Sequence, residues 1–282
     1  MIFWIASYPK SGNTWLRALI SSYFYSQDGL YNETNIKKID QFPQKNYFTS
    51  FDYNKNLVTD TSRFWIKAQE KINSDKKLKF FKTHNAFGAL NNNSFTNKNN
   101  SIGCLYVIRD PRNIFTSLKN HYELNDDQAI NWMMNEKQYI FDNFDEDFYS
   151  NFQFISSWQT NYKSWWVQKQ IPIKIIKYED LLTKTYIVFK DVIEFINKTI
   201  KSSDKVNIKK LKNSVQSTTF DKLKNIEKEK GFSEAVTSKN SKDKIPFFFL
   251  GPKNNWNKIL SEDLKIRLHS NFEKNLKELS YI

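Results

Sequence analysis

A short apolar run that passes through a tight turn directly into a helical pattern constrains the fold of this chain most. The stretch is FWIASYPKSGNTWLRALISSYF, residues 3–24. Residues 2–6 predict a buried strand, and the apolar spacing over 14–25 predicts a helix. A helix that begins directly after such a turn presents unpaired N–H groups and the positive end of its dipole. The segment therefore predicts a strand–turn–helix unit that binds an anion.

The same alternation recurs along the chain. Further apolar runs predict strands, and helical patterns follow two of them; the strands are 78–82, 104–108 and 173–176, and the helices are 112–122 and 186–197. Strands this apolar that alternate with helices indicate a parallel sheet covered on both faces. No internal repeat or convincing linker divides the chain, so we expect a single α/β domain over residues 1–282.

Charge and cysteine content limit the classes of protein that fit. The formal net charge is +13, but the lysines are scattered, which fits solvated faces or an anionic ligand better than a nucleic-acid partner. The single cysteine, Cys104, excludes an intrachain disulfide and fits a reducing compartment. Neither a signal peptide nor an apolar stretch of the ~20 residues that span a membrane is recognisable. We expect a cytoplasmic protein with no membrane partner.

Three segments lie outside these predicted strands and helices. The asparagine-rich stretch 91–101 and the stretch 233–244 predict surface loops or mobile flaps. The stretch 123–150 combines acidic and aromatic side chains, and these include Asp126, Asp127, Asp145, Glu146, Asp147, Phe148 and Tyr149. The aromatic side chains over 123–166 suit either the core or the apolar wall of an acceptor pocket.

The first strand end carries the strongest chemical signal. Ligands of parallel sheets bind beyond the carboxyl ends of the strands, so the residues after each strand matter most. Lys10 is followed by Ser11, Asn13 and Thr14, while Gly12 permits close approach of an oxyanion to the backbone. The pattern G-x-x-x-x-G-K-[ST] of nucleoside triphosphatases is absent. The turn predicts a phosphate or sulfate site, since an ordinary strand–helix turn needs no lysine among small donors.

The second strand end reads FFKTHN. His84 is either a structural histidine or a base for a hydroxyl acceptor, because a pKa near ~6.5 leaves the ring largely neutral at pH 7. Lys82 points to the same side of the strand and can hold developing negative charge.

The third and fourth strand ends offer one arginine and one tyrosine. Asp110 and Pro111 are explained as the cap and first turn of a helix, which leaves Arg109 as a fork for phosphate oxygens. Tyr178, which follows the last strand, suits either core packing or a ligand contact.

Taken together, these segments resemble the cytosolic-type sulfotransferases, which use 3′-phosphoadenosine 5′-phosphosulfate (PAPS) as sulfuryl donor. YPKSGNTW is similar to their 5′-phosphosulfate loop, usually YPKSGTTW, and YVIRDPRNIFTSLKNHY is similar to their 3′-phosphate segment. KTH resembles the segment with the catalytic histidine, and SSWQTNYKSWW and KYEDL also match in order. The resemblance covers residues 3–260 and implies a three-layer P-loop-like fold.

The resemblance also implies roles for individual residues. Lys10 would contact the bridging oxygen, His84 would remove the acceptor proton, and Lys82 would assist at the sulfuryl group. Trp15 and Phe220 would sandwich the adenine. The implied donor-binding residues are Lys10, Ser11, Gly12, Asn13, Thr14, Trp15, Arg109, Ser117, Tyr178, Thr218, Phe220, Gly251 and Lys253. No metal is expected, since fixed lysines and a helix N-terminus can stabilise the transferring group.

One motif departs from the family pattern. Family members usually carry Arg-Lys-Gly near the last motif, whereas this chain reads FFFLGPKNNWNKIL, with Phe249 and Leu250 at the arginine and lysine positions. We expect either weaker binding of the 3′-phosphate or compensation by Lys253, two residues after Gly251.

Two other classes of function compete. An ATP-using P-loop-like kinase would need a GK[ST] turn and a Mg²⁺ ligand after a later strand, and the sequence has neither. A non-catalytic protein that binds a glycan, or PAP (the desulfonated product of PAPS), would not need a catalytic base. The presence of both Lys10 and His84 therefore argues against it. The acceptor is either a small hydroxylated molecule or an acidic glycan, with an amine as a further option, and the oligomeric state stays open.

Overall fold

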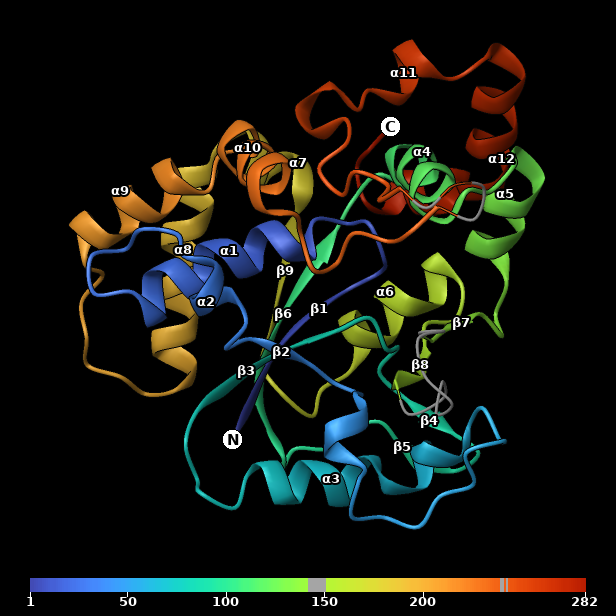
Figure 1. The fold of residues 1–282 in the computed structure, drawn as a ribbon. Helices are drawn as coiled ribbons and strands as arrows, with labels where there is room; N and C mark the ends of the chain where they lie inside the picture. Colours follow the sequence, from blue (N-terminus) through green and yellow to red (C-terminus); the bar gives the residue numbers. More distant parts are fainter. Residues whose placement is uncertain (142–150, 239–240, 242) are drawn as a thin grey trace.

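A five-stranded parallel sheet lies at the centre of the computed structural model, which describes residues 1–141, 151–238, 241 and 243–282 (Figure 1). The strand order is β2-β3-β1-β6-β9, and every neighbouring pair is parallel. The strands are β1 (Ile2–Ser7), β2 (Asp40–Gln41), β3 (Lys79–Thr83), β6 (Ser101–Ile108) and β9 (Ile173–Lys177). The acidic and aromatic residues at 145–149 lie outside the described residues.

Alternation along the central strand builds two cores. Phe3 and Ile5 of β1 face one side of the sheet, and Trp4 and Ala6 face the other. The first side is covered by α1 (Asn13–Tyr25), α7 (Tyr178–Thr183), α8 (Thr185–Thr199) and α9 (Ile208–Ser217). The second is covered by α3 (Trp65–Ile72), α4 (Pro111–Tyr122), α5 (Asp126–Met134), α6 (Trp158–Val167) and α12 (Glu262–Glu278). The predicted three-layer α/β fold is confirmed.

Short elements connect these layers. The antiparallel pairs are β4 (Ala89–Leu90) with β5 (Asn93–Ser94) and β7 (Tyr139–Ile140) with β8 (Gln153–Phe154). The remaining helices are α2 (Glu33–Ile36), α10 (Phe220–Lys230), α11 (Trp256–Ile259) and the 3-10 turns η1 (Lys45–Tyr47), η2 (Asp60–Phe64) and η4 (Gly251–Lys253). Among the described residues, no helix is both long and apolar enough to cross a membrane.

The predicted strands and helices are all present, with shifted ends, but the prediction of a surface loop over 91–101 is partly wrong. Phe95 is fully buried, and Ser101 begins β6. Trp4 Nε1 donates to Ser101 Oγ at 2.6 Å, and Gln69 Nε2 donates to the Phe95 carbonyl at 2.6 Å. Polar residues can be buried when such hydrogen bonds satisfy them, and polarity alone therefore misjudged this segment.

The parallel register places four predicted site segments together. Strands β1, β3, β6 and β9 run in one direction, so all of them end at one edge of the sheet. Asp110 accepts a hydrogen bond from the Arg112 amide and Pro111 occupies the first turn of α4, as predicted. This capped helix start leaves Arg109 at the strand end, on the edge where the turn after β1 and His84 also lie.

Candidate active site

A cavity of about 1010 Å³ opens at the carboxyl edge of the sheet. Most of the predicted site residues line it, and these are Lys10, Gly12, Asn13, Thr14, Trp15, Lys82, His84, Arg109, Ser117, Tyr178, Phe220 and Gly251. Three others do not. Ser11 and Thr218 are buried behind the wall, and Lys253 lies in η4 with an exposed side chain.

The turn after β1 is shaped to receive an anion. Gly12 adopts φ 102°, and a Cβ atom at this position would lie 2.5 Å from Tyr178 Cδ2, so only glycine fits without displacement. Helix α1 starts at Asn13 with no side-chain cap, and the Ser11 hydroxyl is buried without a partner among the described residues. Uncapped N–H groups and an orphaned hydroxyl suit the oxygens of a phosphate or sulfate group.

Asn13 has a different orientation from its neighbours. Its amide nitrogen donates to the Ile5 carbonyl at 2.9 Å and to Ser7 Oγ at 3.2 Å. This side chain therefore ties the start of α1 to β1, and its contribution to an anion in the turn is left to the backbone N–H.

Lys10 lies in the cavity with its charge suppressed. Burial is the main cause that lowers the pKa of its ammonium group to about 7; Glu234 opposes this shift, and the charges of Lys82 and Arg109 add to it. The Lys10 Nζ atom sits 4.1 Å above the centre of the Phe247 ring. The backbone carbonyl of Lys10 accepts a hydrogen bond from Arg109 Nη1 at 3.0 Å. This bond links the turn to the end of β6.

His84 is held as a neutral ring. Its Nδ1 atom lies 2.7 Å from the Ser7 carbonyl, which can only accept, so Nδ1 carries the proton and Nε2 is the basic nitrogen. Burial, together with the charge of Lys82, lowers the pKa of the ring to about 3. The His84 backbone N–H donates to Gln153 Oε1 at 2.8 Å, and its carbonyl accepts from Asn161 Nδ2 at 2.9 Å.

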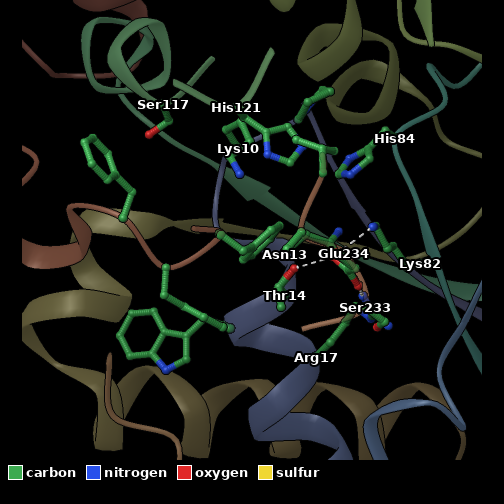
Figure 2. Close-up of a pocket in the computed structure, with 18 of the residues that line it drawn as sticks. Lys10, Asn13, Thr14, Arg17, Lys82, His84, Ser117, His121, Ser233 and Glu234 are labelled. Carbon is green, nitrogen blue, oxygen red and sulfur yellow. Dashed lines mark hydrogen bonds and ion pairs between the residues drawn. The ribbon is translucent and has the colours of Figure 1, made fainter. Parts of the chain in front are cut away.

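A half-buried carboxylate, that of Glu234, lies among the cations of the site, and no pattern in the sequence indicated it. Thr14 Oγ1 donates to Glu234 Oε2 at 2.9 Å, Lys82 Nζ lies 3.2 Å from the same oxygen, and Arg17 Nη1 pairs with Oε1 (Figure 2). Burial opposes ionisation of Glu234, but the charges of Lys82 and Arg17 hold its pKa well below the usual range. Glu234 belongs to the segment predicted to be a surface loop or flap.

The second predicted anion position centres on Arg109. Its guanidinium lies 4.2 Å above the Tyr178 ring, and its Nε atom is buried without a partner among the described residues. Ser117 Oγ donates to the Asn113 carbonyl at 3.3 Å and accepts from Asn254 Nδ2 at 3.0 Å. Arg109 thus keeps an unused donor at the cavity wall.

Two aromatic side chains predicted to contact adenine line the same cavity. Trp15 packs edge-on against Tyr178 with ring centres 5.9 Å apart. Phe220 opens α10 beside Gly251, where a Cβ atom would lie 2.2 Å from the phenyl ring. Gly251 is therefore required by the packing of Phe220.

His121 is a second cavity residue that the sequence analysis missed. It is 9% exposed, and burial together with the charge of Lys10 lowers the pKa of its ring to about 3. It follows Ser117 by four residues on α4, and this spacing on one helix face was the available signal. The cavity lining also includes amides and aromatic rings, contributed by Gln41, Gln44, Tyr122, Phe141, Asn151 and Gln153. No group of three or more potential metal ligands occurs within the described part of the chain.

Comparison with known proteins identifies the class to which this fold and cavity belong. A family model described as the sulfotransferase domain matches residues 2–280, so the chain belongs to the sulfotransferase family. A curated relative, luciferin sulfotransferase of Photinus pyralis, is 24% identical over 288 residues, covering 99% of this chain and 72% of that protein.

Two solved structures share the fold. Retinol dehydratase in complex with androsterone and the inactive cofactor PAP gives a TM-score of 0.57 at 14% identity, covering 98% of this chain and 80% of that one. A mouse sulfotransferase complexed with PAP gives 0.58 at 15% identity, covering 98% and 84%. The predicted family and enzyme class are thereby confirmed.

Proposed function

We propose that this sulfotransferase takes its sulfuryl group from PAPS and transfers it to the hydroxyl group of a small molecule. The observation that carries the proposal is the neutral His84 ring, with Nε2 as its basic nitrogen, in one cavity with Lys82 and the anion-binding turn. A base beside an anion site suits attack by a hydroxyl group on a transferring sulfuryl group.

The donor fits the polar atoms that lack partners. The uncapped start of α1 and the buried hydroxyl of Ser11 suit the 5′-phosphosulfate, and the unused Nε of Arg109 suits the 3′-phosphate with Ser117. Trp15 and Phe220 would hold the adenine between them. PAP in two structures of the same fold supports this choice of nucleotide.

The 3′-phosphate is the least supported contact. Phe249, at the position where the family has arginine, is 44% exposed and lines the cavity as an apolar side chain. Lys253, whose side chain is exposed, would have to turn toward the cavity to compensate. Weaker 3′-phosphate binding and compensation by Lys253 both stay predictions.

The transfer would proceed in one displacement. The acceptor oxygen attacks sulfur while its proton passes to His84 Nε2, and the bond from sulfur to the bridging oxygen of the 5′-phosphate breaks. Lys10 stabilises the charge on the departing phosphate, and Lys82 stabilises the equatorial sulfuryl oxygens. A positioned base contributes about 10²–10⁴-fold in rate, and a positioned donor contributes about 10²–10³-fold. We expect no metal in this step.

The acceptor class rests on the cavity wall and on the relatives. Amide and aromatic side chains are part of the cavity lining, which suits a hydroxylated ring system. Androsterone in the retinol dehydratase structure supports a small molecule. An acidic glycan and an amine remain alternatives for the same catalytic groups.

The test is transfer of labelled sulfate from PAPS to a panel of phenols, alcohols, amines and glycans. We expect His84→Ala to lower turnover about 10²–10⁴-fold while PAP affinity is unchanged. His269→Ala, at a partly exposed position of helix α12 that does not line the cavity, is the matched histidine control. Wild-type turnover in H84A on a hydroxyl acceptor would refute the base assignment. Phosphate transfer from ATP would favour the kinase, and PAP binding without transfer would favour a non-catalytic protein.

A further inference from the structure

The Glu234 carboxylate occupies a subsite built from cationic and hydroxyl side chains on separate elements. Thr14 and Arg17 come from α1, and Lys82 comes from β3 (Figure 2). Resting on the function proposed above, which puts the phosphosulfate end of the donor at this turn, we propose that Arg17 is a further donor-binding side chain there. We also propose that Glu234 is the internal anion that the donor displaces.

Arg17 is placed for this role by the helix. It follows Thr14 by three residues, so both side chains lie on the same face of α1 near its start. Arg17 is 6% exposed and lines the cavity. Its Nη2 atom donates to the Ile39 carbonyl at 2.9 Å, Nη1 pairs with Glu234, and Nε is buried without a partner among the described residues. The guanidinium is thus anchored on one side and directed at an anion on the other.

The charge balance explains why an internal anion is present. Lys10, Arg17, Lys82 and Arg109 all line the cavity, and buried cations repel one another unless an anion lies between them. Glu234 supplies one negative charge, and the lowered pKa of its carboxyl keeps that charge through the neutral pH range. A phosphosulfate brings more negative charge and more oxygens to the same donors, so it can replace the carboxylate.

The donor and Glu234 cannot use the same donors together. Thr14 Oγ1 has one proton, and that proton is directed to Glu234 Oε2. A phosphosulfate at Thr14 and Lys82 would bring two anions into contact, which is unfavourable. The Ala235 N–H donates to the Phe232 carbonyl at 3.0 Å, which closes a backbone turn around Glu234. The proposed displacement is a rotation of the Glu234 side chain about its own bonds, with this turn kept.

A double-mutant cycle separates the two roles. Titration calorimetry without acceptor would measure PAP and PAPS affinity for wild type, E234A, R17A and the E234A/R17A double variant. Removal of the internal anion in E234A is expected to tighten binding about tenfold. Loss of one charge-assisted contact in the double variant is expected to weaken binding about 10- to 100-fold relative to E234A. R17K in the E234A background should fall between the two, because the charge remains without the planar fork.

Matched controls and outcomes make the cycle decisive. Glu229→Ala on the exposed face of α10 and Arg63→Ala in η2 test for general charge effects. Unchanged affinity in E234A overturns the role of Glu234, and equal affinity of E234A and E234A/R17A overturns the role of Arg17. An effect on PAP and PAPS alike supports a phosphate subsite, and an effect on PAPS alone supports a sulfuryl subsite. If wild type itself binds neither nucleotide, the proposed function fails first, before any variant is compared.

Discussion

Lys10 shows how one residue links burial to ligand binding. Burial, with Lys82 and Arg109 nearby, lowers its pKa to about 7, so the ammonium is only partly charged at neutral pH. A phosphate group at the turn favours the charged form. Donor binding is therefore expected to take up a proton at Lys10, and the affinity for the donor should depend on pH.

PAP affinity should fall from pH 7 to pH 9 by up to about tenfold per pH unit. The sign follows because the protonated ammonium binds the phosphate, and the protonated fraction falls as pH rises above the pKa of the ligand-free site. Lys10→Arg should bind PAP with little change over this range, since a guanidinium stays charged. Calorimetry at three pH values measures both. If PAP affinity depends on pH as steeply in K10R as in the wild type, a group other than Lys10 titrates.

At the scale of elements, the site depends on how β1 meets α1. Gly12 turns the chain with a positive φ, and Tyr178 from the start of α7 packs directly against it. The turn, α1 and α7 therefore form one unit in which backbone conformation sets the direction of the free N–H groups. The Arg109 guanidinium stacks on the ring of Tyr178, the same residue that packs against Gly12.

Gly12→Ala should disrupt this unit. The added Cβ would lie 2.5 Å from Tyr178 Cδ2, and the positive φ is costly for alanine. We expect a loss of about 1–3 kcal/mol in the free energy of unfolding and a PAP affinity reduced at least about tenfold. Urea unfolding and calorimetry measure the two effects. Gly88→Ala, where a Cβ atom meets nothing within 4 Å, is the control. A G12A protein that binds PAP like wild type would contradict the model of the turn.

At the scale of the whole molecule, residues from the two ends of the described chain share one core. Ile2 and Leu279 belong to the same hydrophobic cluster. Tyr281 OH donates to Glu179 Oε2 at 3.0 Å, and the Asp110 N–H donates to Glu179 Oε1 at 3.0 Å. Glu179 thereby connects the start of α7 to the start of α4, next to Arg109, and to Tyr281 after α12.

Tyr281→Phe tests this long-range connection. Loss of a hydrogen bond to the half-buried Glu179 carboxylate, whose pKa is raised by partial burial, should cost about 1.5 kcal/mol in the free energy of unfolding. Urea unfolding at pH 7 measures it, with Tyr186→Phe on the exposed side of α8 as control. Equal unfolding midpoints for Y281F and wild type would show that Glu179 is satisfied without Tyr281.

Much of the fold was predictable because its signals are local. The apolar runs of β1, β3, β6 and β9 and the helical pattern of α1 depend on neighbours a few residues away, and the structure confirms them. Parallel strands end at one edge, so the approach of His84 and Arg109 to the turn followed from the topology. The burial of Phe95 was missed, because nothing local shows that Gln69 satisfies its carbonyl.

The sequence by itself determined the sheet, the strand–turn–helix unit and the family, since each of these depends on short motifs and their order. Only the tertiary structure decided what surrounds the turn. Glu234 contacts Thr14 across 220 positions of sequence and Arg17 across 217, and no periodicity relates residues so far apart. The basic nitrogen of His84 was likewise decided by the Ser7 carbonyl, 77 positions away. Burial then lowered the pKa values of both Lys10 and His84, because desolvation depends on the packed fold and not on neighbours in sequence.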